Sequence, residues 1–261
     1  MLFKIFVLIF VLLLSGCAKD IATVETVGES VLSEKKESWG MRRRAPEQPE
    51  FTDAQRAAMD KYGCIYLGSK EQKYLYLTFD EGYENNQTAK ILDTLKEKGV
   101  KAAFFITGDY FKAEGALVDR MVKEGHIVGN HTMNHPCMPD IKSEEKIEEE
   151  VLSLDRAFYE KYNKHMKFFR APEGAYSEKT LAITKELGYT NVFWSFAYDD
   201  WYRDKQRGAD YAYKKTMDNI HPGCVILLHA VSSDNAEALG KIIDSARDMG
   251  YTFLSLEEYI P

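Results

Sequence analysis

Two carboxylates stand where a long apolar stretch ends. Asp80 and Glu81 directly follow the run Tyr74–Phe79. In such a pair, one carboxylate can hold a metal ion while the other accepts a proton from water. An ordinary turn at a strand end also uses acidic residues and glycine, and Gly82 comes next. The pair alone therefore leaves catalysis and a simple turn both open.

Two histidines follow another apolar stretch. His131 and His135 come after Ile127–Val128 and are four residues apart. On a helical turn this spacing puts both imidazoles on one face, where they can bind the same ion. Two imidazoles together with a carboxylate suit Zn²⁺ best, although Co²⁺, Mn²⁺ and Fe²⁺ also fit such a donor set. An HxxxH pair occurs by chance in many proteins and is a weak signal by itself.

Three further groups follow apolar runs. Arg170 at a strand end can orient and ionise a carboxylate through a bidentate bond. Asp200, as a partner of His229, would raise the pKa of that imidazole toward the role of a general acid. Trp201 beside Asp200 suits stacking on the face of a sugar. The alternatives are a surface arginine, a core tryptophan and a core histidine with satisfied hydrogen bonds.

Strands and helices are predicted to alternate from Gln72 onward. The predicted strands are short apolar segments: Tyr74–Phe79, Ala102–Ile106, Ile127–Val128, Phe168–Phe169, Val192–Phe196, Cys224–Leu228 and Thr252–Leu254. The predicted helices are Thr52–Lys61, Gln87–Lys98, Phe111–Glu124, Ser143–Tyr162, Glu178–Leu187, Tyr211–Ile220 and Asn235–Met249. Several end in glycine, the expected left-handed stop. This order predicts an α/β fold of βα units, in which chemistry collects at the carboxyl ends of the strands.

Taken together, five of these segments resemble the polysaccharide deacetylase family, carbohydrate esterase family 4, with its NodB-homology domain. The resemblance runs from about Tyr74 to Leu256. Its motifs are Thr78-Phe79-Asp80-Glu81, His131-Thr132-Met133-Asn134-His135, Arg170-Ala171-Pro172-Glu173-Gly174, Asp200-Trp201 and Leu227-Leu228-His229. The resemblance implies a distorted (β/α)7 barrel.

The resemblance also implies a role for each site residue. These are Asp80 as general base, Arg170 as the group that orients it, Asp200 as the partner of the acid His229, the metal ligands Glu81, His131 and His135, and the substrate-binding residues Trp201, Leu227 and Glu173, the last through its backbone N–H. The family usually has aspartate where this chain has Glu81. Because glutamate is one methylene longer, we expect the ion to sit differently, or Glu81 to swing away and leave the ion to the histidines and waters.

The chain resembles one branch of this family more closely, namely the muramic-δ-lactam-forming deacetylases of the bacterial spore cortex. The features are Ser38-Trp39-Gly40, Tyr76–Asn85, Phe193–Ala197 and His229–Leu239. The branch implies N-acetylmuramic acid in peptidoglycan as substrate, deacetylated after an amidase has removed the stem peptide. The alternatives are a deacetylase for N-acetylglucosamine, chitin oligomers or acetyl-xylan, and an inactive glycan-binding module.

The start of the chain predicts export. The apolar stretch Ile5–Leu14 is too short to span a membrane, which takes roughly 20 residues. It leads into Leu14-Ser15-Gly16-Cys17, which resembles the bacterial lipobox. We therefore expect Cys17 to be lipidated and the protein to be anchored to the outer face of the cytoplasmic membrane. The alternative is an ordinary secretory signal with an incidental cysteine.

The remaining features set domain limits and exclude one class of partner. The expected segments are a signal peptide (1–16), a lipidated cysteine and tether (17–38), an N-terminal extension packed on the barrel (39–71) and a catalytic domain (72–261). The formal net charge of −7 argues against nucleic-acid binding. The run Arg42–Arg44 is typical of a solvated patch, or contacts an anionic wall polymer. Cys64, Cys137 and Cys224 show no CxxC pattern, and their odd number leaves a free thiol.

Overall fold

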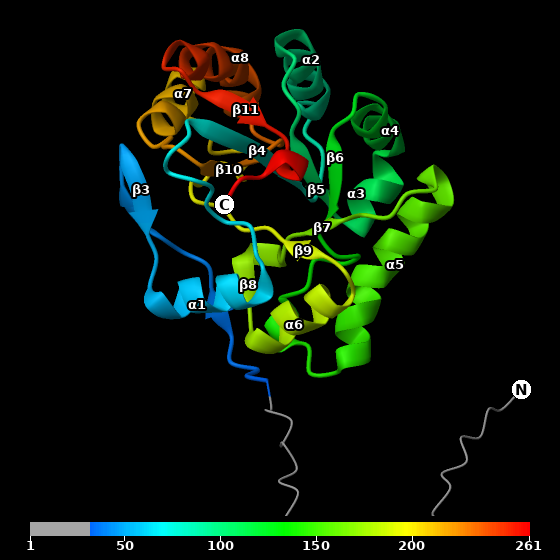
Figure 1. Ribbon diagram of the computed structural model, residues 1–261. Helices are drawn as coiled ribbons and strands as arrows, with labels where there is room; N and C mark the ends of the chain where they lie inside the picture. Colours follow the sequence, from blue (N-terminus) through cyan, green and yellow to red (C-terminus); the bar gives the residue numbers. More distant parts are fainter. Residues whose placement is uncertain (1–31) are drawn as a thin grey trace, which may run out of the picture. The chain divides into compact units, whose positions relative to one another are not determined.

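Seven parallel strands form the central sheet of the computed structural model, which describes residues 32–261. Along the sheet the order is β10 (Cys224–His229), β4 (Tyr74–Glu81), β5 (Ala103–Ile106), β6 (Ile127–Asn130), β7 (Phe168–Phe169) and β9 (Thr190–Asn191), and β11 (Thr252–Leu254) also pairs with β4. The sheet curves as a half-barrel with helices around its outside (Figure 1). The predicted α/β class with a parallel sheet is confirmed.

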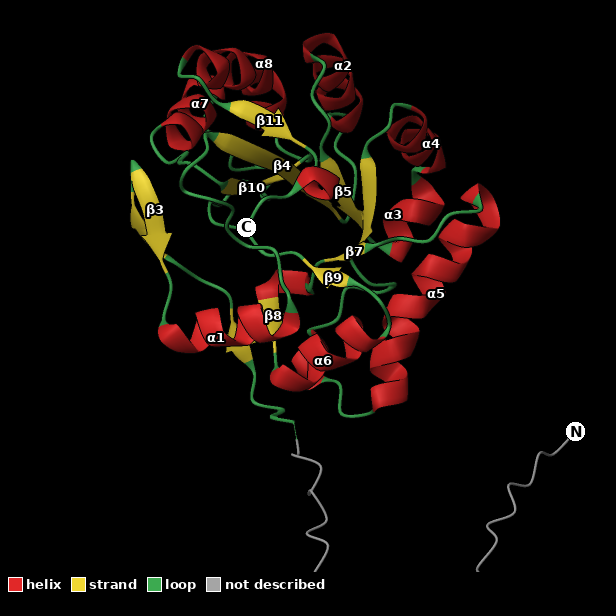
Figure 2. Cartoon of the chain, in the orientation of Figure 1, coloured by secondary structure: helices red, strands yellow, loops and turns green. Residues whose placement is uncertain are grey.

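Helices connect successive strands and cover the outer face of the sheet (Figure 2). They are α1 (Asp53–Tyr62), α2 (Thr88–Lys98), α3 (Gly108–Ala113), α4 (Gly115–Lys123), α5 (Glu144–Tyr162), α6 (Glu178–Glu186), α7 (Ala209–Met217) and α8 (Ser233–Asp248). The side chains of Ser143, Ser177 and Ser232 cap α5, α6 and α8 by accepting a backbone N–H from the first turn. The predicted single helix Phe111–Glu124 is wrong, because the chain breaks into α3 and α4 at Glu114.

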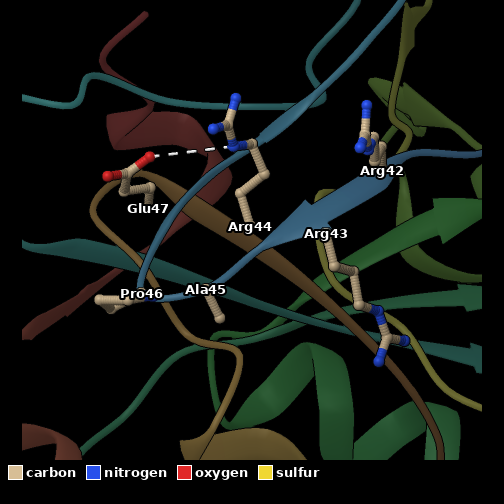
Figure 3. A pocket seen from close by; sticks show the side chains of 6 residues that line it. All are labelled: Arg42, Arg43, Arg44, Ala45, Pro46 and Glu47. Atoms are coloured by element: carbon tan, nitrogen blue, oxygen red, sulfur yellow. Dashed lines mark ion pairs between the residues drawn. The ribbon is translucent and has the colours of Figure 1, made fainter.

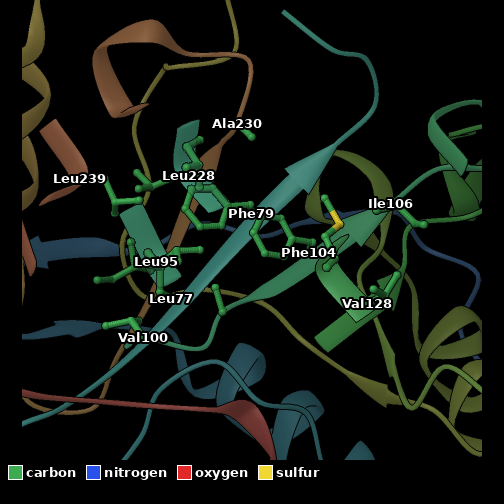
Figure 4. Packing of buried hydrophobic residues seen from close by; sticks show 14 of the residues in the cluster. Leu77, Phe79, Leu95, Val100, Phe104, Ile106, Val128, Leu228, Ala230 and Leu239 are labelled. Atoms are coloured by element: carbon green, nitrogen blue, oxygen red, sulfur yellow. The ribbon is translucent and has the colours of Figure 1, made fainter. Parts of the chain in front are cut away.

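Side chains of β4 alternate between two environments, and this alternation positions the site. Leu75, Leu77 and Phe79 belong to the apolar core between the sheet and the helices, with Leu95 of α2 and Leu239 of α8 (Figure 4). Burying each of these large side chains contributes about 1.5–3 kcal/mol. The intervening residues of β4 therefore face the inside of the half-barrel.

The strand predicted at Val192–Phe196 is wrong in extent. The regular strand β9 is Thr190–Asn191, and the chain beyond it makes only single parallel bridges, Ile65 with Val192 and Phe196 with Ile226. The short pairs β1 (Glu37–Ser38) with β8 (Ala175–Tyr176), and β2 (Arg42–Arg44) with β3 (Glu47–Glu50), have no counterpart among the predicted strands.

The segment before the sheet packs against the loop that follows β7. The β1–β8 pair is antiparallel, and Trp39 N donates to Gly174 O at 2.9 Å. The Trp39 indole is buried against Phe51 and Phe193, and its Nε1 donates to Trp194 O at 2.8 Å. These bonds hold the Arg170–Gly174 loop from behind.

Cys64, Cys137 and Cys224 are all free thiols. Burial raises the pKa of Cys64 and of Cys224 to about 12, so both are inert. No helix within residues 32–261 has the length and apolar character needed to cross a bilayer. The signal sequence, Cys17 and most of the expected tether lie outside the described residues.

Candidate active site

Asp80 and Arg170 form a buried ion pair inside the half-barrel. Arg170 Nη1 donates to Asp80 Oδ1 at 2.7 Å. The other donors of the guanidinium go to Thr78 Oγ1 at 2.9 Å and to the carbonyl oxygen of Val192 at 3.0 Å, so the contact with Asp80 is single rather than bidentate. Burial raises the pKa of the Asp80 carboxyl, but Arg170, with His131 and His229, outweighs it and holds that pKa below its ordinary value. Asp80 is therefore a carboxylate at neutral pH.

His229 ends β10 beside Asp80. The parallel register pairs His229 with Asp80, and both positions face the inside of the half-barrel. His229 Nδ1 donates to Asp200 Oδ1 at 2.7 Å, and Asp200 Oδ2 accepts from His229 N at 2.9 Å and from Asn235 Nδ2 at 2.6 Å. Burial lowers the pKa of His229, but Asp200 outweighs burial and raises it above its ordinary value. The predicted partnership of Asp200 with His229 is present.

His131 and His135 lie close together, although they do not share a helix. Residues 131–135 form a loop in which Thr132 and His135 have φ of 71° and 57°, so the expected helical turn is wrong. The rings are nonetheless 4.9 Å apart, centroid to centroid. Because a carbonyl can only accept, His131 Nδ1 donates to Arg170 O at 2.7 Å and Nε2 keeps its lone pair. Burial lowers the pKa of His131 to about 4, which keeps the ring neutral.

These groups line a cavity of about 470 Å³ at the carboxyl ends of the strands. The lining residues are Asp80, Gly82, Tyr83, His131, His135, Glu173, Gly174, Trp194, Ala197, Trp201, Leu227 and His229. Asp80 Oδ2 is 3.6 Å from His131 Nε2. The cavity therefore brings together the Asp80 carboxylate, the neutral imidazole of His131, the imidazole of His135 and a third imidazole, His229, of raised pKa.

Glu81 is not part of this cavity, which corrects the prediction that it binds metal with the two histidines. Its side chain is fully buried, and neither carboxylate oxygen has a hydrogen-bond partner among the described residues. The reason is strand alternation: Glu81 has the same parity as Leu77 and Phe79 and faces the helices. Burial, with the charges of Glu84 and Asp80, raises the pKa of the Glu81 carboxyl well above its ordinary value.

The donor set suits a divalent cation in part. His131 offers Nε2 while its Nδ1 is fixed by a carbonyl, the second bond that metal-ligating histidines commonly make. His135 is its neighbour in the cavity lining. No group of three or more His, Cys, Asp or Glu side chains in residues 32–261 has the arrangement of a complete metal site. An ion here would thus take two protein imidazoles and draw its other ligands from water or substrate.

The loop after β7 shapes one wall of the cavity. Glu173 has φ 60° and ψ 3°, a conformation uncommon outside glycine, and Gly174 follows with φ 64°. A Cβ at Gly174 would lie 2.6 Å from the Trp194 ring, so no larger residue fits there without displacement. Such strained positions cluster at functional sites. Trp194 is a lining residue that the sequence reasoning did not single out.

An aromatic edge borders the opening. Trp201 is 42% exposed and its ring lies 5.6 Å from that of His229, as expected for a stacking platform rather than a core residue. Tyr83, which was not predicted, lines the same cavity and donates its hydroxyl to Trp201 O at 2.7 Å. Leu227 of β10 is buried in the wall. Asn235, also not predicted, could have been suspected because it follows the final histidine motif.

Comparisons with known proteins agree on one family. The polysaccharide deacetylase model matches residues 68–192. Peptidoglycan-N-acetylmuramic acid deacetylase PdaA of Bacillus subtilis is 42% identical over 85% of this chain and 84% of its own length. A peptidoglycan-N-acetylglucosamine deacetylase of Bacillus cereus is 33% identical over 72% of this chain and 89% of its own length.

Solved structures give the same result. The structure of Bacillus subtilis PdaA, a family 4 carbohydrate esterase, superposes with a TM-score of 0.85 and 40% identity, over 87% of this chain and 98% of that one. The similarity to this structure covers a larger share of the chain than residues 68–192, which the family model matches.

Proposed function

The chain belongs to the polysaccharide deacetylase family, carbohydrate esterase family 4, and on that premise we propose that it hydrolyses the N-acetyl group of N-acetylmuramic acid in peptidoglycan. The proposal rests on two side chains of neighbouring strands whose pKa values are shifted in opposite directions. Asp80 is held as a carboxylate by Arg170, and His229 is held toward its protonated form by Asp200. Two groups whose pKa values are pushed apart are the usual arrangement of a base and an acid.

The base step uses Asp80. Its Oδ1 is fixed by Arg170, which leaves Oδ2 to accept a proton from a water molecule in the cavity. The water oxygen then bonds to the acetyl carbon, and negative charge develops on the carbonyl oxygen. We propose that the backbone N–H of Glu173 donates to that oxygen, because its loop lines the cavity.

The acid step uses His229. Its Nδ1 is occupied by Asp200, so Nε2 is the nitrogen that can give a proton to the departing amine. As the carbon–nitrogen bond breaks, this proton neutralises the leaving nitrogen and the products are acetate and a free amino sugar. Trp201 and Leu227 are proposed to contact the sugar.

We propose that His131 and His135 hold the divalent metal on which the family depends, with Zn²⁺ the best match to two imidazoles. A bound ion would polarise the acetyl carbonyl and make the attacking water more acidic. His131 is suited to this role because it stays neutral and its free nitrogen is Nε2.

The muramic acid substrate, the spore cortex and the lactam product are proposals supported by the similarity to PdaA. The freed amine can close onto the lactyl carboxylate only if no stem peptide blocks that carboxylate. We therefore propose that an amidase removes the peptide in a preceding step. The alternative of an N-acetylglucosamine, chitin or xylan substrate uses the same groups. The alternative of an inactive binding module is favoured by one observation, the absence of Glu81 from the cavity.

Measuring acetate release distinguishes between these alternatives. Residues 18–261 are incubated with amidase-treated peptidoglycan, with and without Zn²⁺, and acetate and muramic products are measured by mass spectrometry. We expect metal-dependent acetate and a lactam product from the wild type, and neither from Asp80→Asn. Acetate from glucosamine-type substrates alone would mean that the substrate is N-acetylglucosamine rather than N-acetylmuramic acid. Glycan binding without acetate release under any metal would favour the inactive module.

Three further proposals concern the whole chain. Cys17 is proposed to carry the lipid that anchors the exported protein to the outer face of the cytoplasmic membrane. The segments 17–38, 39–71 and 72–261 are proposed as tether, extension and catalytic domain. The sheet is proposed to be the family's distorted (β/α)7 barrel, and the bridge of Phe196 to Ile226 supports this because it links the chain after β9 to β10.

A further inference from the structure

Asn235 is buried beside the acid pair of Asp200 and His229 but does not line the cavity. It lies in the first turn of α8, where its backbone N–H donates to Ser232 Oγ at 3.2 Å. Because the side chain does not reach the cavity, any part that it takes in the reaction passes through a neighbouring group.

Both ends of the Asn235 side-chain amide are engaged. Its Nδ2 donates to Asp200 Oδ2 at 2.6 Å and to His229 O at 3.3 Å, and its Oδ1 accepts from the Tyr198 hydroxyl. Since a carboxylate and a carbonyl can only accept, these bonds fix which way the amide points. The bond from the buried Tyr198 hydroxyl also polarises the amide and strengthens its N–H as a donor.

The Asp200 carboxylate accepts three N–H groups. Its Oδ1 accepts from His229 Nδ1, and its Oδ2 accepts from His229 N and from Asn235 Nδ2. Asp200 is only 4% exposed, so water can take up little of its charge. Within residues 32–261, Asn235 is thus the one donor to this carboxylate that does not belong to His229.

The charged groups that face His229 come from three other segments. Asp200 lies in the segment after β9, Asp80 is on β4 and Arg170 follows β7. The two carboxylates favour the protonated imidazole, and Arg170 opposes it. Asp200 has the largest of these effects, so a change in the charge that it presents affects His229 most.

The arginines of β2 are not among these groups. Arg42 and Arg44 both pair with Glu50, and the side chain of Arg43 points to the other side of the strand, as Figure 3 shows. The Arg43 guanidinium donates to Ala197 O instead of meeting the acid pair. The contacts of Asp200 therefore decide how strongly the protonated imidazole is held.

We propose that Asn235 is a positioning residue that weakens the hold of Asp200 on the protonated form of His229. This inference rests on the proposed function, in which His229 is the acid. The amide takes up part of the negative charge of Asp200, and Tyr198 keeps the amide turned toward it. An imidazole that is held too strongly in its protonated form gives up its proton slowly.

Three variants and one control test this role. Asn235→Leu replaces the amide with an apolar group of similar size, and Tyr198→Phe removes only the hydroxyl that orients the amide. Asn235→Asp keeps an acceptor for Tyr198. The control is Asn191→Leu, which removes another buried amide, one that donates to Thr184 Oγ1 at 2.8 Å.

Two measurements are made on each protein. Acetate release from amidase-treated peptidoglycan gives kcat, KM and the pH profile of kcat/KM. Proton NMR of the metal-free protein without substrate follows the His229 Nδ1–H resonance and its titration. The second measurement requires no catalysis.

We expect Asn235→Leu to raise the pKa of His229 further, because Asp200 then presents more of its charge to the imidazole. The alkaline limb of kcat/KM should move to higher pH and the Nδ1–H resonance to lower field. We expect kcat to fall about tenfold, as for loss of a hydrogen bond to a charged group, with KM nearly unchanged. Tyr198→Phe should give smaller changes in the same directions, and Asn191→Leu should give none.

Asn235→Asp tests the donor itself and keeps the inference testable if Asn235→Leu does not fold. A carboxyl at this position can donate to Asp200 only while it is protonated, and two carboxyls in contact share one proton. We therefore expect kcat close to that of the wild type in mild acid and a growing deficit as the pH rises. A ratio of the two kcat values that does not change with pH would contradict the inference.

Three other results would overturn it. An unmoved limb and resonance in Asn235→Leu would mean that Asn235 only packs, and a lowered pKa of His229 would mean that its loss merely releases Asp200. Equal effects of Asn191→Leu would show that any buried amide matters.

The NMR arm separates this inference from the proposed function. If the wild type releases no acetate but Asn235→Leu moves the Nδ1–H resonance and raises the pKa of His229, the function falls and the contact acts on His229 as inferred. If the wild type releases acetate and neither the resonance nor the pH profile moves, the inference falls and the function stands.

Discussion

Replacing Arg170 with methionine tests the electrostatic design of the site most directly. The Arg170 side chain is fully buried and donates to Asp80, Thr78 and the backbone oxygens of Val192 and Phe193. Methionine keeps an unbranched side chain of similar length but removes the charge. Asp80 would then be a buried carboxylate without its cation. Breaking a buried pair in this way typically costs about 3–5 kcal/mol of unfolding free energy.

The sign of the pH dependence follows from the pKa of Asp80. In the wild type that pKa is depressed, so the ion pair stabilises the fold above the unfolded value of about 3.9 and this contribution is lost as pH falls through the folded value. In Arg170→Met, burial acts unopposed by the guanidinium and raises the pKa of Asp80. The cost of the substitution is therefore greatest at pH 7.5 and smaller at pH 5, where the carboxyl takes up a proton.

Urea unfolding of four proteins measures this prediction: wild type, Arg170→Met, Asp80→Asn and the double variant, each at pH 7.5 and 5. The double variant removes the uncompensated charge as well, so we expect it to be at least about 2 kcal/mol more stable than Arg170→Met at pH 7.5. A loss below about 1 kcal/mol for Arg170→Met, or no recovery in the double variant, would refute the reasoning. Where activity survives, the acidic limb of kcat/KM should move to higher pH.

Three other predictions concern single contacts. Asp200→Asn should lower the pKa of His229, so the alkaline limb of the kcat/KM profile moves to lower pH; an unmoved limb would show that His229 is not the acid. Glu81→Gln should retain metal-dependent activity within about threefold, because the side chain faces the helices, and loss of bound zinc by equilibrium dialysis would contradict this. Gly174→Ala should lower the unfolding free energy by about 1–3 kcal/mol in urea titrations, because of its positive φ and the Trp194 ring; an unchanged value would mean that the loop relaxes freely.

The sequence predicted where most strands lie, because apolar runs that stop at a polar residue are visible without a structure, although β4 and β6 run two residues past their predicted ends and β9 stops at Asn191. It thereby located Asp80, His131, Arg170 and His229, which the fold brings to one cavity. Glu81 was misplaced because the predicted strand stopped at Phe79, whereas β4 continues to Glu81, and two successive residues of a strand cannot both face the same side.

Other features were not accessible from the sequence. The loop that brings His131 to His135 depends on positive φ at Thr132 and His135, neither of which is glycine, and the HxxxH spacing predicted a helical turn instead. Trp194 joins the cavity only because the chain after β9 leaves the regular strand pairing and packs on Gly174. Such conformations depend on tertiary contacts rather than on local preference.

The register between β4 and β10 explains why one site can hold both a base and an acid. Asp80 and His229 are paired positions of adjacent strands, so their charges interact and each favours the charged form of the other. Left to that attraction alone, they would form one ion pair. Arg170 and Asp200 engage Asp80 Oδ1 and His229 Nδ1 separately, which leaves Asp80 Oδ2 and His229 Nε2 for other partners. These surroundings hold Asp80 deprotonated and shift His229 toward its protonated form, the two forms that hydrolysis of an amide requires at its start.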